Sequence, residues 1–210
     1  ELSLTLLDVH ERSVASVRRL VERFDLGAHV RSIVAADATE YDREGGAPVD
    51  VVVVEAMQRS LGVEPQVAIT RHLAGSLAPG GVLVPERTRV DLVLSDPEFE
   101  AASGCEPASA AAVRVPAGPV FELTRESALS PVDEEGRFPP VTVTLPSATG
   151  TGRQAMLFTT VVALGPHVLA PGDSGLTVPE VLWQVPALPA GARLQFRYRL
   201  GPRPGLEWSL

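Results

Sequence analysis

Short apolar runs alternate with helical periodicity over the first ninety residues of the chain. Four strands are predicted by apolar runs at residues 4–7, 30–35, 49–54 and 82–84. Apolar residues at helical spacing predict one helix between Ser13 and Gly27 and another over 65–77 that ends at Pro79-Gly80-Gly81. The apolar face of the first helix is expected to consist of Val14, Val17, Leu20 or Val21, and Phe24. The run at 49–54 is nearly all valine, which is typical of a strand covered on both faces. This alternation predicts an α/β fold, a Rossmann-like parallel sheet with helical crossovers.

Beyond residue 90 the helical periodicity disappears. Short strand-like runs, separated by proline, glycine and serine, follow at 90–94, 113–115, 120–123, 141–145, 156–164, 181–185 and 194–200. Such a series is typical of an antiparallel β-barrel or sandwich. The stretch 101–112 is expected to be a loop or short helix, and the polar segment 126–140 an excursion. We therefore expect two domains, 1–88 and 89–210.

Composition narrows the class of protein. The chain has 210 residues, 45% of them hydrophobic and 21% charged, as is usual for a globular protein. A net charge of -8 argues against a nucleic-acid binder and is compatible with a cationic substrate or a basic partner protein. No apolar run approaches about 18 residues, so no membrane span is expected. The single cysteine, Cys105, excludes an internal disulfide and is consistent with a reducing, cytoplasmic setting.

Two glutamates, Glu55 and Glu64, lie at the edge of the predicted parallel sheet where ligands of α/β proteins bind. Glu55 follows the valine strand directly, and Glu64 precedes the helix that starts at Pro65. Both carboxylates can therefore converge on one cationic group. The alternative is that Glu64 simply complements the dipole of the helix as a first-turn acid.

Four segments in this order resemble class I methyltransferases that use S-adenosylmethionine, specifically the protein arginine methyltransferase type. They are the strand end Leu6-Leu7-Asp8-Val9, the turn Ala36-Asp37-Ala38, the pair Glu55 and Glu64, and the stretch from Leu77 to Glu86. The change to β structure near residue 90 also fits, because that family appends a β-barrel at this point. The resemblance covers about ninety residues firmly and the rest in outline.

The resemblance implies a role for each of these acids. Asp8 would accept both ribose hydroxyls of the cofactor S-adenosyl-L-methionine, and Val9 would pack on the adenine. Asp37 would accept from the adenine amino group, while the backbone N–H of Ala38 donates to a ring nitrogen. Glu55 and Glu64 would be the catalytic pair that binds the methyl acceptor. The alternatives are a turn residue for Asp8 and a helix N-cap for Asp37.

The chain departs from the family at three places. The first strand and its glycine-rich turn are not visible, and we expect them to precede Glu1 or to come from a separate chain. The Thr-His-Trp loop is not visible either, since His167 has no tryptophan beside it. Arg59 lies between the two glutamates and could pair with one of them.

The sequence therefore predicts a methyltransferase whose acceptor is a guanidine or other nucleophile of a protein, a peptide or a small natural product. The contrasting hypothesis is a non-catalytic scaffold or one subunit of a heteromer. A homodimer is also possible, with 126–140 as the counterpart of the family's dimerisation arm.

Two further motifs and the histidines are predicted to be structural. The motif Gly172-Asp173-Ser174-Gly175 is similar to the nucleophile segment of trypsin-like serine hydrolases, but a turn is the favoured interpretation. The segment 150–155 fits a dinucleotide fingerprint, but a strand-like run follows it instead of the required helix. The four histidines show no metal-ligand spacing, so no metal is expected.

Overall fold

The computed structural model describes residues 2–42, 46–102, 113–147, 153–182 and 189–210. By the density of internal contacts the chain divides into two compact units, Glu1–Pro48 and Val49–Leu210. The domain boundary expected after residue 88 lies inside the second of these units.

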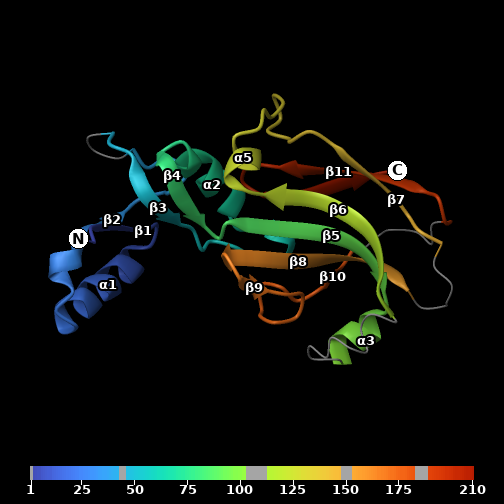
Figure 1. Ribbon diagram of the computed structural model, residues 1–210, viewed down its shortest axis with the longest axis horizontal. Coiled ribbons are helices and arrows are strands. Elements are labelled where there is room, and N and C mark those ends of the chain that lie inside the picture. The colour runs from blue at the N-terminus through green and yellow to red at the C-terminus, as the bar shows by residue number, and fades with distance from the viewer. Residues whose placement is uncertain (1, 43–45, 103–112, 148–152, 183–188) are drawn as a thin grey trace. The chain divides into compact units, whose positions relative to one another are not determined.

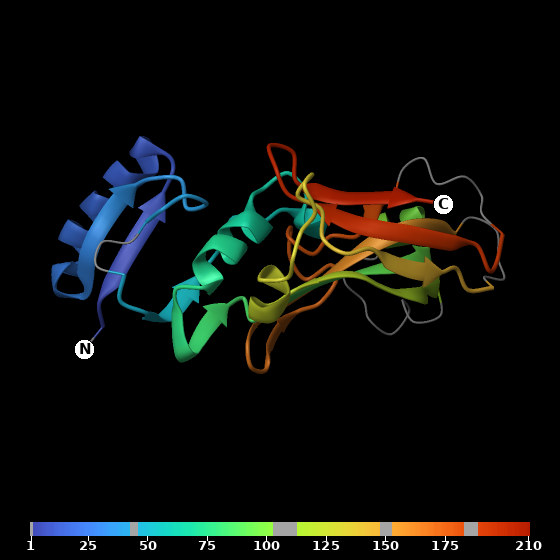
Figure 2. The ribbon, with the colours of Figure 1, turned by 90° about the horizontal axis from the view of Figure 1, so that it is seen from above.

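The first unit is a parallel β-α-β element. It consists of β1 (Leu4–Asp8), α1 (Glu11–Arg23), the 3-10 turn η1 (Gly27–His29) and β2 (Val30–Ala35). The two strands pair in parallel with α1 alongside them (Figure 2). The helix begins earlier than predicted because Asp8 Oδ1 accepts the N–H of His10 at 2.7 Å and turns the chain directly after β1. Of the predicted apolar face, Val14 is buried, whereas Leu20 and Phe24 are 51% and 63% exposed.

The second unit opens with another parallel pair. It consists of β3 (Val49–Val53), the 3-10 turn η2 (Arg59–Leu61), α2 (Gln66–Ala74) and β4 (Leu77–Val84). The prediction ended the helix at Pro79-Gly80-Gly81, but this segment lies within β4, at an irregularity in the pairing with β3. A Cβ at Gly81 would lie 3.1 Å from the carbonyl oxygen of Val49, so a larger residue would fit only if the neighbouring backbone moved by a few tenths of an ångström. The valine strand is covered on one face only, since Val51 and Val53 are 55% and 69% exposed.

The strands of the predicted parallel sheet form one parallel pair in each unit, β1 with β2 and β3 with β4.

The rest of the second unit is antiparallel and forms two sheets (Figure 1). The larger has the order β10-β8-β5-β6, with β9 paired to β8, and the smaller has the order β12-β11-β7. The strands are β5 (Arg87–Ser95), β6 (Val115–Leu123), β7 (Val141–Thr144), β8 (Gln154–Leu164), β9 (His167–Leu169), β10 (Glu180–Val181), β11 (Arg193–Arg199) and β12 (Gly205–Ser209). The described residues of this part also include two short helices, α3 (Pro97–Ala102) and α5 (Arg125–Ala128).

The two antiparallel sheets lie face to face as two layers, with the main core between them (Figure 2). Along β11 the alternation is strict: Leu194, Phe196 and Tyr198 are buried, while Gln195 and Arg197 between them are not. The predicted run 120–123 and Val115, the last residue of the predicted run 113–115, belong to one strand, β6, whose prolines are tolerated because it is the edge of its sheet. The strands β9 and β12 were not predicted. Residues 103–112 and 183–185, which also carried predictions, lie outside the described residues.

Within the described ranges, no helix has both the length and the apolar character that crossing a membrane requires.

Candidate active site

Glu55 and Glu64 delimit a loop that we call the glutamate loop, residues 54–64. Glu55 comes two residues after the end of β3 and Glu64 two residues before the start of α2, as the sequence predicts. Glu55 is exposed and Glu64 half-buried. In the part of the chain that the structure describes, neither carboxylate has a hydrogen bond or an ion pair. Two carboxylates thus remain available at the carboxyl end of a parallel strand.

Arg59, which the sequence offered as an internal partner, pairs with neither glutamate. No ion pair within 4.0 Å involves Arg59 in the described ranges, and its side chain is exposed. The negative charge of Glu55 and Glu64 is therefore not neutralised inside the loop.

The middle of the glutamate loop is fixed to the antiparallel sheets. Leu61 is fully buried in the main core, and its carbonyl oxygen accepts from the hydroxyl of Tyr198 at 2.7 Å. The N–H of Ser60 donates to Oγ1 of Thr159 at 3.1 Å, and both residues are buried. The contact between Ser60 and Thr159 spans 99 positions of the sequence, and the contact between Leu61 and Tyr198 spans 137. The loop is consequently anchored in the folded interior, although Glu55 near its start is exposed and Glu64 at its end is half-buried.

The loop also has a strained backbone. Ser60, Leu61 and Val63 have φ of 55°, 56° and 68°, in the left-handed region that side chains other than glycine avoid. The N–H of Glu64 donates to the carbonyl oxygen of Gly62 at 2.7 Å, which closes a three-residue γ-turn around Val63. A γ-turn with positive φ at its centre is rare and strained. Strain of this kind persists only where the surrounding structure holds it, and it gathers at functional sites.

In the first unit, Asp8 and Asp37 lie at the carboxyl ends of neighbouring strands. Asp8 ends β1, and Asp37 comes two residues after β2. Asp8 accepts the N–H of His10, and Asp37 Oδ1 accepts both the N–H and the hydroxyl of Thr39, at 2.8 and 2.7 Å. Each acid therefore shapes a local turn, which agrees with the alternative interpretation of Asp8 and replaces the helix N-cap proposed for Asp37.

Val9 and Ala38 follow these two acids. The side chain of Val9 is 61% exposed, which is unusual for a valine beside a strand end. Ala38 lies within the turn that Asp37 closes with Thr39. Whether the acids of the first unit and the glutamates of the second bind one molecule stays a prediction.

Sequence reasoning missed the residues that hold the glutamate loop, foremost Gln66, Thr159 and Tyr198. None of them belongs to a motif. The only local signal is Gln66, a polar residue in a predicted helix that turns out to be 1% exposed.

The serine-hydrolase motif is a turn, as the favoured interpretation holds. Ser174 Oγ accepts the N–H of Leu176 at 3.2 Å, and Asp173 Oδ2 accepts the N–H of Ala170 at 2.7 Å.

In the segment 150–155, the strand β8 begins at Gln154 where a dinucleotide site would need a helix; residues 148–152 lie outside the described part. No cluster of three or more potential metal-ligating acids, histidines or cysteines occurs among the described residues.

Comparison with known proteins identifies the fold. No family model and no curated protein matches the chain. Among solved structures, it is similar to the Trypanosoma brucei PRMT1 enzyme–prozyme heterotetrameric complex with AdoHcy, at a TM-score of 0.58 and 12% identity, covering 94% of this chain and 71% of that one. It is also similar to Arabidopsis thaliana protein arginine methyltransferase 10, at a TM-score of 0.61 and 14% identity, with 94% and 72% covered. A third similar structure is PRMT6, at 0.58 and 13%, with 98% and 83% covered.

The class that these similarities define is the methyltransferase fold of the arginine methyltransferase type. The chain has this fold over nearly its whole length, as the resemblance of its motifs implied.

Proposed function

We propose that this chain forms the core of an S-adenosylmethionine-dependent methyltransferase whose acceptor is a guanidine or other nucleophile of a protein, a peptide or a small natural product. The glutamate loop carries the proposal. It presents two carboxylates that have no partner among the described residues, on a strained backbone fixed by the interior, within an arginine methyltransferase-like fold. The net charge of -8 favours the approach of a cationic acceptor.

The residues of the first unit fit the adenosine half of the cofactor. Asp8 uses Oδ1 for the His10 N–H, which leaves Oδ2 to accept from a ribose hydroxyl. Val9 offers exposed apolar surface to an adenine ring. When bound, the cofactor supplies a methyl group on a positively charged sulfur.

Glu55 and Glu64 would bind and orient the acceptor. Two carboxylates suit a guanidinium because they fix its plane and localise its charge on one side. With the cofactor bound, Glu55 and Glu64 would hold the acceptor nitrogen toward the methyl donor, and one of the two carboxylates would accept the proton that this nitrogen loses on methylation. Orienting the acceptor in this way would supply most of the rate.

Isothermal titration of the full natural chain with S-adenosylhomocysteine tests the proposal. We expect binding, and we expect Asp8→Ala to weaken it roughly tenfold or more, the loss of one or two hydrogen bonds to a charged group. Glu22→Ala, which removes an exposed acid from α1, serves as the control and should leave the affinity unchanged. Equal affinity of the wild type and Asp8→Ala would remove the ribose role from Asp8.

A second candidate is a non-catalytic subunit of a heteromer. The similar Trypanosoma brucei structure is a complex of an enzyme with a prozyme. A chain that takes up no S-adenosylhomocysteine by itself, and is not stabilised by it against heat, would favour this candidate.

A further inference from the structure

Gln66 makes two hydrogen bonds that lie on either side of Glu55. It is the first residue of α2, and its side chain is 1% exposed. Its Oε1 accepts the N–H of Ala56 at 2.9 Å, and its Nε2 donates to the carbonyl oxygen of Val54 at 3.1 Å. We call this pair of bonds the Gln66 bridge.

The bridge begins where the sheet stops. The last ladder bond of this edge joins the N–H of Val54 to the carbonyl oxygen of Val84 at 2.8 Å. Beyond it, the Gln66 amide takes the place of a neighbouring strand, since it offers one acceptor and one donor to the two peptide groups that flank Glu55. With both of these groups bonded, the backbone of Glu55 is fixed and so is the direction of its side chain.

The same bridge relates Glu55 to Glu64. Gln66 follows Glu64 by two residues, and Glu64 is itself fixed by the γ-turn around Val63. A fully buried amide therefore ties the strand end that carries one carboxylate to the helix start that carries the other. We infer that Gln66 is a positioning residue that sets Glu55 against Glu64. This inference rests on the proposed function of the glutamate pair.

The test compares Gln66→Met with the wild type in the full natural chain. Methionine has similar length and no amide, so the N–H of Ala56 loses its acceptor. We expect the Ala56 amide to exchange its hydrogen at least about tenfold faster. With an arginine-containing peptide as the probe acceptor, kcat should fall about 10- to 100-fold while the affinity for S-adenosylhomocysteine is unchanged.

Thr70→Val is the matched control. Thr70 lies in the same helix, is also 1% exposed, and its hydroxyl has no hydrogen-bond partner among the described residues. This variant should leave both the Ala56 exchange and kcat as in the wild type.

A second variant covers the case that Gln66→Met does not fold. Gln66→Glu keeps the acceptor for Ala56, replaces the donor to Val54 with an oxygen that repels the carbonyl oxygen of Val54, and adds a buried carboxylate that the helix N-terminus partly compensates. We expect the Ala56 amide to stay protected in it and kcat to fall less than in Gln66→Met.

The outcomes separate this inference from the proposed function. If the Ala56 amide of Gln66→Met exchanges its hydrogen at the wild-type rate, the inference is overturned whatever the turnover. It is also overturned if this amide exchanges faster while kcat stays at the wild-type value. Faster exchange in a protein whose wild type neither binds S-adenosylhomocysteine nor methylates the peptide contradicts the proposed function, and leaves the Gln66 bridge as a structural contact without a catalytic role.

Discussion

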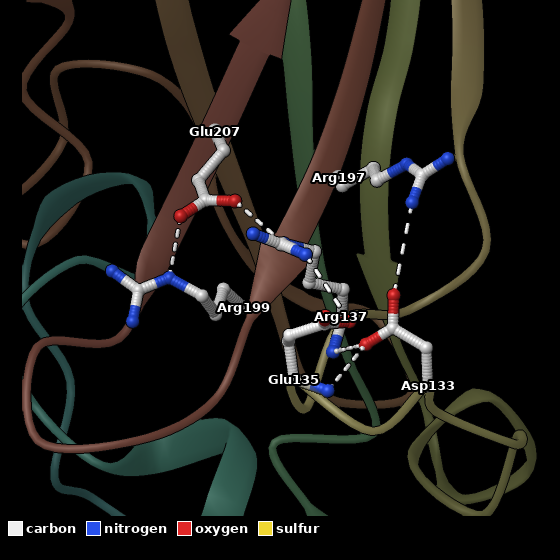
Figure 3. A network of polar contacts seen from close by, with 6 residues as sticks. All are labelled: Asp133, Glu135, Arg137, Arg197, Arg199 and Glu207. Atoms are coloured by element: carbon white, nitrogen blue, oxygen red, sulfur yellow. Dashed lines mark hydrogen bonds and ion pairs between the residues drawn. The ribbon is translucent and has the colours of Figure 1, made fainter.

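The strand β11 holds two segments of the second unit, one on its buried side and one on its exposed side. On the buried side, Tyr198 binds the glutamate loop through Leu61. On the exposed side, Arg197 and Arg199 belong to an ionic network that includes the segment 133–137 (Figure 3). This segment lies in the stretch 126–140, which the resemblance suggested as a dimerisation arm and which here lies along β11 of its own chain.

The contact on the buried side does not depend on charge. Burial raises the pKa of Tyr198, so its hydroxyl stays protonated and donates over the working range of pH. The ring stacks on Phe121 at a centroid distance of 4.7 Å, which fixes where the hydroxyl points. Neither salt nor moderate acid weakens such a neutral contact in the core.

The contacts on the exposed side are ionic. Glu207 accepts from Arg199 and, at 3.1 Å, from Arg137, while Asp133 lies 3.7 Å from Arg197 (Figure 3). Burial raises the pKa of Glu207, but the hydrogen bonds from the two arginines outweigh it and the net direction is downward. The segment with the candidate chemistry is therefore fixed by neutral interior contacts. The surface segment depends more on charge.

The largest effect is expected for Glu55→Gln. The change keeps the shape of the side chain and removes the charge that would bind the acceptor. With an arginine-containing peptide, turnover should fall about 100- to 1000-fold, as on loss of one preorganised electrostatic group. Glu135→Gln makes the same change in the surface segment and should leave turnover intact. Wild-type turnover of Glu55→Gln would take the catalytic role from this residue.

Tyr198→Phe should have the next largest effect. It leaves the carbonyl oxygen of Leu61 buried without its donor, which costs about 1–3 kcal/mol in the free energy of unfolding. Ser60→Ala is the control in the same loop, because the Ser60 hydroxyl is buried without a partner among the described residues. Urea unfolding measures both variants. If Tyr198→Phe lowers the free energy of unfolding no more than Ser60→Ala does, the hydrogen bond from β11 does not stabilise the glutamate loop.

Val63→Gly should stabilise the protein slightly. Relief of the left-handed backbone at Val63 should raise the free energy of unfolding by about 1–2 kcal/mol. The extra conformational freedom of glycine in the unfolded chain should lower it by about 0.5–1 kcal/mol. The same change at Val51, an exposed position in the regular strand β3, should instead destabilise. Turnover of Val63→Gly should fall as the γ-turn before Glu64 loosens. A loss of stability equal to that of Val51→Gly would show that the turn is not strained.

The sequence predicts the positions of those site residues that are determined by the residues directly before them in the chain. Asp8 and Glu55 were placed at strand ends because an apolar run stops directly before each of them. The structure bears out these positions, and the similar structures bear out the fold that the motifs suggested.

The contacts that fix the site could not be predicted, because they join residues far apart in sequence. Nothing near Tyr198 indicates that its hydroxyl reaches Leu61, 137 positions away. The Gln66 bridge depends on the angle at which α2 returns to β3, which periodicity does not encode. Local signals also misled where tertiary pairing overrides them, as at Gly81, whose Pro-Gly-Gly context predicts a helix end and which lies in a strand irregularity.

The smallest effect, and the one that sharpens the comparison, is expected for Glu207→Gln. The pKa of Glu207 is lower in the folded chain than its ordinary value of 4.5, so its stabilising contribution is present above that value and is lost as the pH falls through the lowered pKa. Because its side chain is 41% exposed and screened by solvent, we expect a loss of only about 0.5 kcal/mol at pH 7 and low salt. Urea unfolding at pH 7 and pH 3, with and without about 0.5 M salt, should show that this loss is smaller in acid and smaller in salt. The loss in Tyr198→Phe should stay constant under the same conditions. If both losses shrink in parallel, the two faces of β11 do not differ in the way their contacts depend on charge.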